Sequence, residues 1–202
     1  VGDAVSAQDV RRMNELSERT GMQDKWNKKD WRSHLSLIAS SARANDMQLE
    51  DLAAWGKSSA KELIGLFPPK ARGNLGDVLG RAVDGAIRGI RANGDATKGT
   101  DEYLRLLQGL RQAIDEKRLA WSNWVKLSKE VPTKKSMALA EPVKAAASQY
   151  DRHPQLQEDI RDYCESIFRL AAGALKQYQD AKKKRGMIDF VDQEQFMLHA
   201  LD

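Results

Sequence analysis

The chain has 202 residues, 41% of them hydrophobic and 31% charged, a balance that excludes a disordered chain and fits one domain of ordinary size. The net charge of +4 permits contact with polyanions but does not require it, because 29 acidic residues dilute the 33 basic ones. One cysteine, Cys164, excludes an internal disulfide and favours the cytoplasm, and no apolar run approaches the roughly 20 residues that span a bilayer.

Strong helix formers are frequent throughout the sequence, and no stretch alternates apolar and polar residues long enough to predict a strand. We therefore predict an all-α fold, an irregular helical bundle of about eight to nine helices with one long C-terminal helix. The first four helices are expected near residues 6–21, 27–45, 49–55 and 58–67. The second carries Trp31, Leu35, Ile38 and Ala42 at helical spacing, which predicts a buried face.

Further helices are expected after Pro68-Pro69, beginning with one over residues 74–93 whose apolar face holds Leu79, Val83 and Ile90. Helices should follow from residue 100 onward, around 121–127, over 136–149 and over 155–184, with a short one from residue 189. The long helix over 155–184 has an apolar stripe running from Ile160 to Tyr178. We read residues 1–202 as one helical subdomain with a mobile sub-lobe around residues 68–100.

No motif in the chain predicts catalysis or a bound cofactor. The glycines between Gly73 and Gly80 have neither a following Lys-Ser/Thr pair nor a preceding strand, so they do not form a phosphate loop. His34, His153 and His199 are far apart in the sequence and Cys164 has no cysteine partner, so no metal site is expected. No catalytic residue is assigned.

Basic residues gather in four places where they could neutralise nucleic-acid phosphates, and one of these, residues 182–185, is better explained as a helix end. A solvated helix face or a helix end explains each group separately as well. Among the tryptophans, Trp31 and Trp124 lie on apolar stripes and are expected in the core, whereas Trp26 lies in a connection and could stack on a base. The nucleic-acid-binding candidates are Arg81, Arg88 and Arg91 on one side of a helix, Lys28, Lys29 and Arg32 at a helix start, and Lys134 and Lys135 in a turn.

The C-terminal segment has the features of a helix end followed directly by a helix start. Basic residues 182–185 suit the carbonyl end of the long helix, and Gly186 suits a left-handed stop. Asp189 is a good N-cap for the next helix, and Asp192 lies three residues on, near the same amide end. As local structure, this is a helix–turn–helix junction.

The string Arg185-Gly186-x-x-Asp189-Phe190-x-Asp192 resembles the segment that leads back into the motor core of UvrD/Rep-like superfamily 1 DNA helicases. Residues 31–45 with 49–52, and residues 121–127 with 134–136, occur in the family's order before it. Together they resemble the helical insert (subdomain 1B) of the first motor domain, particularly the longer inserts of RecB- and AddA-type relatives.

This resemblance implies a DNA-contacting subdomain of an ATP-dependent helicase, a hydrolase that unwinds DNA in replication, recombination or repair. Its implied partners are the remaining motor domains and duplex DNA or a single–double strand junction, held through phosphates, with no membrane. ATP and Mg²⁺ would bind motor lobes before residue 1 and beyond residue 202, and no cofactor is expected in this chain. The alternative is a helical protein-interaction scaffold with no nucleic-acid role.

Overall fold

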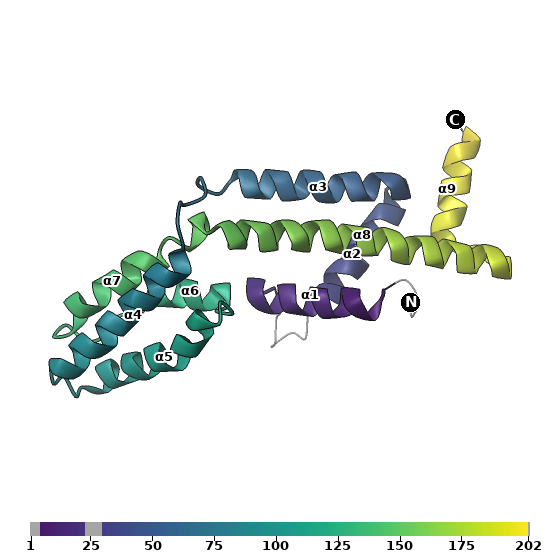
Figure 1. Ribbon diagram of the computed structural model, residues 1–202. Coiled ribbons are helices and arrows are strands. Elements are labelled where there is room, and N and C mark those ends of the chain that lie inside the picture. Colours follow the sequence, from purple (N-terminus) through teal and green to yellow (C-terminus); the bar gives the residue numbers. More distant parts are fainter. Residues whose placement is uncertain (1–4, 23–29, 202) are drawn as a thin grey trace. The chain divides into compact units, whose positions relative to one another are not determined.

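The computed structural model describes residues 5–22 and 30–201, and this part of the chain contains helices and connections but no strand (Figure 1). The predicted all-α bundle of eight to nine helices with one long helix near the C-terminus is confirmed. In chain order the elements are α1 (Ala7–Thr20), α2 (Trp31–Ala44), α3 (Leu49–Gly65), α4 (Leu75–Ala92), α5 (Lys98–Asp115), α6 (Trp121–Leu127), α7 (Met137–Ala147), the 3-10 turn η1 (Tyr150–Arg152), α8 (Pro154–Arg185) and α9 (Phe190–Leu201).

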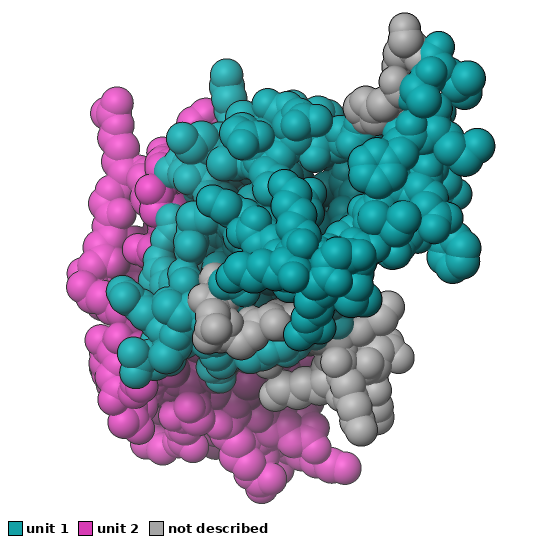
Figure 2. Space-filling model, turned by 90° about the vertical axis from the view of Figure 1, so that its right-hand side faces the viewer, with its two compact units in different colours: residues 1–18, 22–66, 160–202 teal, residues 19–21, 67–159 magenta. Residues whose placement is uncertain are grey.

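The chain divides into two compact units (Figure 2). Unit 1 comprises residues 1–18, 22–66 and 160–202, and unit 2 comprises residues 19–21 and 67–159. The residue ranges of α1 and α8 extend into both units. The expected mobile sub-lobe around residues 68–100 belongs to unit 2, and its mobility stays a prediction.

In unit 1 the apolar faces of α1, α2 and α8 form one core. It contains the predicted Trp31 and Leu35 of α2 together with Leu16 of α1 and Leu170 of α8, all at most 9% exposed. Burial of these faces removes apolar surface from water, which is the main force holding the three helices together. The predicted stripe of α8 ends earlier than its spacing suggests, because Tyr178 is 42% exposed and takes part in a polar network described below.

Helix α3 corrects one prediction, since a single uninterrupted helix, Leu49–Gly65, replaces the two helices expected over residues 49–55 and 58–67. The expected break lay at Gly56, a residue that weakens a helix when nothing packs against it. Here a Cβ at Gly56 would lie 2.8 Å from the Cβ of Phe168 in α8. The glycine therefore allows α3 and α8 to approach closely, and the packing of the two helices outweighs the low helix propensity.

Unit 2 is built around α4, which packs against both α5 and α7. The predicted apolar face of α4 is confirmed, since Leu79, Val83 and Ile90 are at most 1% exposed. Leu107 of α5 and Val143 of α7 are also fully buried. The opposite side of α4 carries the arginines singled out from the sequence, so the buried face of this helix fixes the direction in which they point.

Candidate functional site

Positive charge is concentrated in unit 2. That unit contains 17 basic and 12 acidic residues, a net charge of +5, whereas unit 1 contains 16 basic and 17 acidic residues, a net charge of −1. The small net charge of the whole chain is therefore the sum of one basic unit and one nearly neutral unit. Any polyanion that this chain binds should prefer unit 2 on electrostatic grounds.

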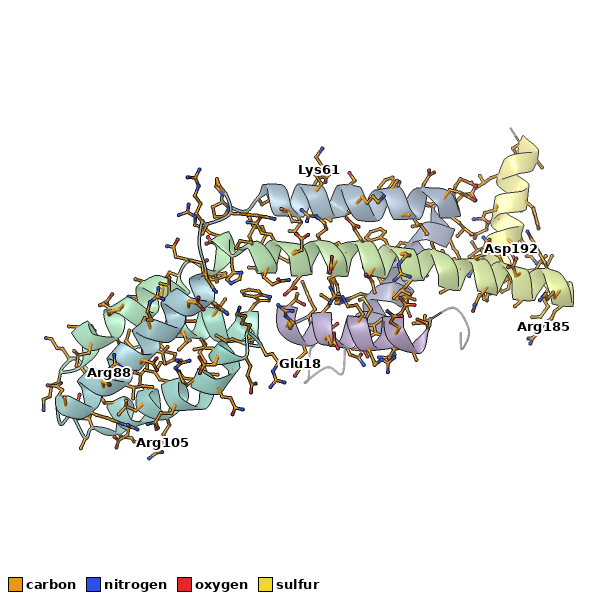
Figure 3. The ribbon with its side chains drawn as sticks, in the orientation of Figure 1. Glu18, Lys61, Arg88, Arg105, Arg185 and Asp192 are labelled. Carbon is orange, nitrogen blue, oxygen red and sulfur yellow. The ribbon has the colours of Figure 1, made fainter. Side chains whose placement is uncertain are left out.

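Arg81, Arg88 and Arg91 all lie exposed on α4, and Figure 3 shows Arg88 on this helix. No carboxylate in the described part of the chain makes an ion pair with any of the three. The face is not uniformly basic, because Asp84 lies on it. A hydrogen bond from Arg111 is the largest cause that holds the pKa of Asp84 below its usual value, and Arg88 adds to it through charge. The α4 arginines are thus free to pair with an external anion.

The basic turn of Lys134 and Lys135 lies against the C-terminal end of α4. The side-chain amide of Asn93, the residue that ends α4, donates to the backbone carbonyl of Lys135 at 3.3 Å and to the hydroxyl of Ser136 at 3.2 Å. Both lysines are exposed, and neither has an ion-pair partner among the described residues. The structure therefore brings two of the three predicted basic groups together in unit 2.

A buried carboxylate fixes this turn. Asp95 is 6% exposed and accepts hydrogen bonds from four hydroxyl groups and one backbone amide. The donor from Ser136, at 2.7 Å, is the largest cause that keeps the pKa of Asp95 well below its usual value, although burial opposes it. The hydroxyls belong to Thr97, Thr100, Thr133 and Ser136, so Asp95 joins the connection before α5 to the basic turn.

The third predicted basic group belongs to unit 1, and its one described member, Arg32, has local partners. Lys28 and Lys29 lie outside the described residues, as does Trp26. Arg32 stands in the first turn of α2, where its guanidinium is 2.7 Å from the carboxylate of Asp30 and 4.3 Å above the ring centre of Trp31. Its charge is therefore already matched locally, in contrast to Arg81, Arg88 and Arg91 of α4.

The C-terminal motif forms the predicted junction. Gly186 has φ of +63° and closes α8, while the amides of Gly186 and Met187 donate back to the carbonyls of Lys183 and Lys182. Asp189 caps α9, since its carboxylate accepts from the amide of Asp192 at 3.2 Å. Asp192 returns the contact by accepting from the amide of Asp189 at 2.9 Å. The two aspartates thus cap the same helix start reciprocally.

The same motif is tied to α2 by a network of charges. Asp189 accepts from the hydroxyl of Tyr178 at 2.7 Å, from Lys182 at 3.2 Å, and from Arg43 at 2.6 and 2.7 Å. The Tyr178 hydroxyl is the largest cause that lowers the pKa of Asp189. Lys182 also pairs with Asp192, which lies where α9 begins beside α8 (Figure 3). The positive charge of Lys182 is therefore neutralised by carboxylates of unit 1.

Within the described residues, no three His, Cys, Asp or Glu side chains come together in a way that could hold a metal ion. No described helix has both the length and the apolar character that a bilayer crossing requires. Searches against protein-family models, curated proteins and solved structures found no match to this chain.

Proposed function

We propose that this chain is a DNA-contacting helical subdomain of an ATP-dependent DNA helicase, in which unit 2 meets the phosphate backbone. ATP and Mg²⁺ belong, on this proposal, to the motor domains of a cytoplasmic parent protein, and those domains are the other partner. The fragment alone should neither hydrolyse ATP nor unwind DNA. The order of the three motif groups along the sequence supports this assignment.

The observation that carries the DNA-binding part is the set of unpaired cations on unit 2. Arg81, Arg88, Arg91, Lys134 and Lys135 are exposed and have no ion-pair partner within the described residues. Other arginines, such as Arg43 of unit 1 and Arg111 of unit 2, each pair with a carboxylate. Cations without internal partners can release counterions from DNA at little cost to the fold.

These five side chains set the scale of the expected salt dependence. If all of them neutralise phosphates of duplex DNA, the slope of log affinity against log salt is about −4.5, and affinity falls roughly 500-fold between 50 and 200 mM salt. Such contacts position a duplex without reading its sequence. Binding should therefore be weak, steeply salt-dependent and independent of base sequence.

A titration of fluorescently labelled forked DNA tests this proposal. Anisotropy at 50 mM salt should rise saturably for forks of unrelated sequence, and the affinity should fall steeply on addition of salt. Absence of binding at low salt would contradict the proposal. Vigorous DNA-stimulated ATP hydrolysis by the purified chain would contradict the assignment of catalysis to the rest of the parent protein.

Exposed apolar side chains in unit 1 favour a second candidate, a protein-interaction scaffold with no nucleic-acid role. Phe190, Phe196 and Leu201 of α9 are 83%, 63% and 84% exposed. Large apolar side chains gathered on one short helix commonly mark a surface that another protein covers. The same fork titration separates the two candidates, because a scaffold should show no affinity for DNA at low salt.

A further inference from the structure

A cavity of about 210 Å³ lies within unit 2, and every residue that lines it belongs to that unit. For scale, a cavity of about 150 Å³ in another protein takes up benzene. The space is therefore sufficient for a single substituted aromatic ring. It is independent of the basic face on α4, because none of Arg81, Arg88 and Arg91 lines it.

Three aromatic rings line this cavity. The ring centre of His153 lies 4.9 Å from that of Trp121 and 5.3 Å from that of Trp124, and the two indole rings lie 5.9 Å apart. Both tryptophans are at most 6% exposed. Rigid rings and aliphatic neighbours such as Leu119 favour a flat, largely apolar guest.

The polar groups on the lining are mostly donors. The Nδ1 of His153 accepts from the backbone amide of Gln155 at 3.1 Å, and burial lowers the pKa of this histidine. A neutral ring with an accepting Nδ1 carries its proton on Nε2, which leaves a second donor on the same ring. Lys117 lines the cavity as well, and it makes no ion pair with any described residue.

Arg19 adds a donor that the folded chain leaves unused. One of its terminal nitrogens lies 2.9 Å from Asp159, but its Nε is buried without a hydrogen-bond partner in the described part of the chain. Asp159 itself is 1% exposed and also accepts from the indole of Trp121 at 2.9 Å and from Gln155 at 3.0 Å. The Arg19 side chain as a whole lines the cavity and is 32% exposed, so its remaining terminal N–H groups can donate to an acceptor that is supplied from outside.

We propose that this cavity binds a planar aromatic anion, a single ring that carries one carboxylate. The ring lies among Trp121, Trp124 and His153, and the carboxylate accepts hydrogen bonds from Arg19 and Lys117. A cation is disfavoured, because Asp159, a buried carboxylate beside the cavity, already has three donors. An uncharged aromatic ligand would make the same apolar contacts, but it would leave the donors of the cavity without a charged acceptor.

Benzoate, benzamide and benzamidine test this assignment, because they share one shape and differ in charge. Each is titrated into the full chain while the five indole N–H signals are followed by ¹H–¹⁵N NMR. Benzoate should shift the Trp121 and Trp124 signals saturably, benzamide should bind at least about tenfold more weakly, and benzamidine should leave both signals in place. No saturable shift with benzoate, or equal binding of benzamide, would overturn the proposal.

A substitution at Lys117 removes one donor without harming the fold. This residue has φ of +54°, a backbone conformation that glycine adopts more readily, so Lys117→Gly should keep the protein folded. Benzoate affinity should fall about tenfold or more in this variant. Arg105→Ala, which removes an exposed cation of α5 that does not line the cavity, should leave it unchanged. Unchanged benzoate binding by Lys117→Gly would overturn the role given to the ammonium group.

Discussion

Arg43 and Asp189 lie 146 positions apart in the sequence, yet one guanidinium nitrogen of Arg43 is 2.7 and 2.6 Å from the two carboxylate oxygens of Asp189. Asp189 also caps the start of α9 and accepts from Tyr178 of α8. One carboxylate thus connects α2, α8 and α9 within unit 1. The motif that resembles a helicase segment has a structural task, and its charges are mostly matched internally.

Asp189→Asn should lower the free energy of unfolding by about 2 kcal/mol, the usual contribution of hydrogen bonds to a charged group. The substitution keeps the shape of the side chain but removes the negative charge that faces Arg43 and Lys182, which are 23% and 12% exposed. Urea unfolding measures the change. Asp180→Asn, at an exposed position of α8, is the control and should be within about 0.5 kcal/mol of the parent. Equal stability of the two variants would contradict the network.

Acid should weaken the same junction. The hydrogen bond from Tyr178 is the main cause that lowers the pKa of Asp189 from its ordinary 3.8, and Lys182 lowers that of Asp192. A carboxylate with a lower pKa in the folded state stabilises the fold above its unfolded pKa and loses this contribution as the pH falls. The free energy of unfolding should therefore drop below about pH 4. The drop should be smaller in Asp189→Asn, and an identical pH profile would contradict the assignment.

Thr100→Val tests the cluster around Asp95 in unit 2. Thr100 is fully buried, and its hydroxyl donates to Asp95 at 2.9 Å. Valine keeps the volume but removes a donor to a buried carboxylate, so the free energy of unfolding should fall by about 1–2 kcal/mol. Ser148→Ala removes an exposed hydroxyl that bonds only within its own helix end, and it should change stability by less than about 0.5 kcal/mol. An unchanged free energy of unfolding in Thr100→Val would show that the cluster does not fix the basic turn.

Gly56→Ala should destabilise the protein, although alanine normally stabilises a helix by up to about 1 kcal/mol over glycine. The new Cβ would lie 2.8 Å from the Cβ of Phe168, which forces α3 and α8 apart at a cost of about 1–3 kcal/mol. Gly65→Ala in the same helix meets no atom within 4 Å and should be neutral or mildly stabilising. Thermal unfolding of both variants gives the comparison. A stabilising Gly56→Ala would contradict the close approach.

Periodicity was sufficient to predict most of the fold. The buried faces of α2 and α4 follow from the spacing of residues such as Leu35 and Val83, because each helix has only one apolar side to bury. The prediction failed at Gly56, where helix propensity was the only information available. The contact that keeps α3 continuous involves Phe168, and the sequence does not show which residue of another helix faces a glycine.

The polar clusters could not be predicted either, because their members come together from separate parts of the chain. Thr97 and Thr100 are near Asp95 in the sequence and could have indicated a local cap, but Thr133 and Ser136 reach it from a distant turn. Tyr178 fitted an apolar stripe by its spacing, yet its environment is set by Arg43 on another helix. Charges on separate helices become partners only through tertiary packing, and one sequence carries no direct record of that packing.

The proposed contact between the unpaired cations of unit 2 and DNA phosphates is tested most directly by two variants that each lose three positive charges. One replaces Arg81, Arg88 and Arg91 by alanine, and the other replaces Lys57, Lys61 and Lys183, which are exposed in unit 1. Fork binding is measured by fluorescence anisotropy between 50 and 200 mM salt for both.

The arginine variant should bind forked DNA at least about tenfold more weakly at 50 mM salt, with a salt slope smaller in magnitude by up to about 3, one for each lost phosphate contact. The lysine variant should retain most of the affinity and the slope of the parent chain. Equal losses in the two variants would mean that only net charge matters, and unaltered binding by the arginine variant would mean that α4 does not meet DNA. Either result would contradict the proposed DNA interface.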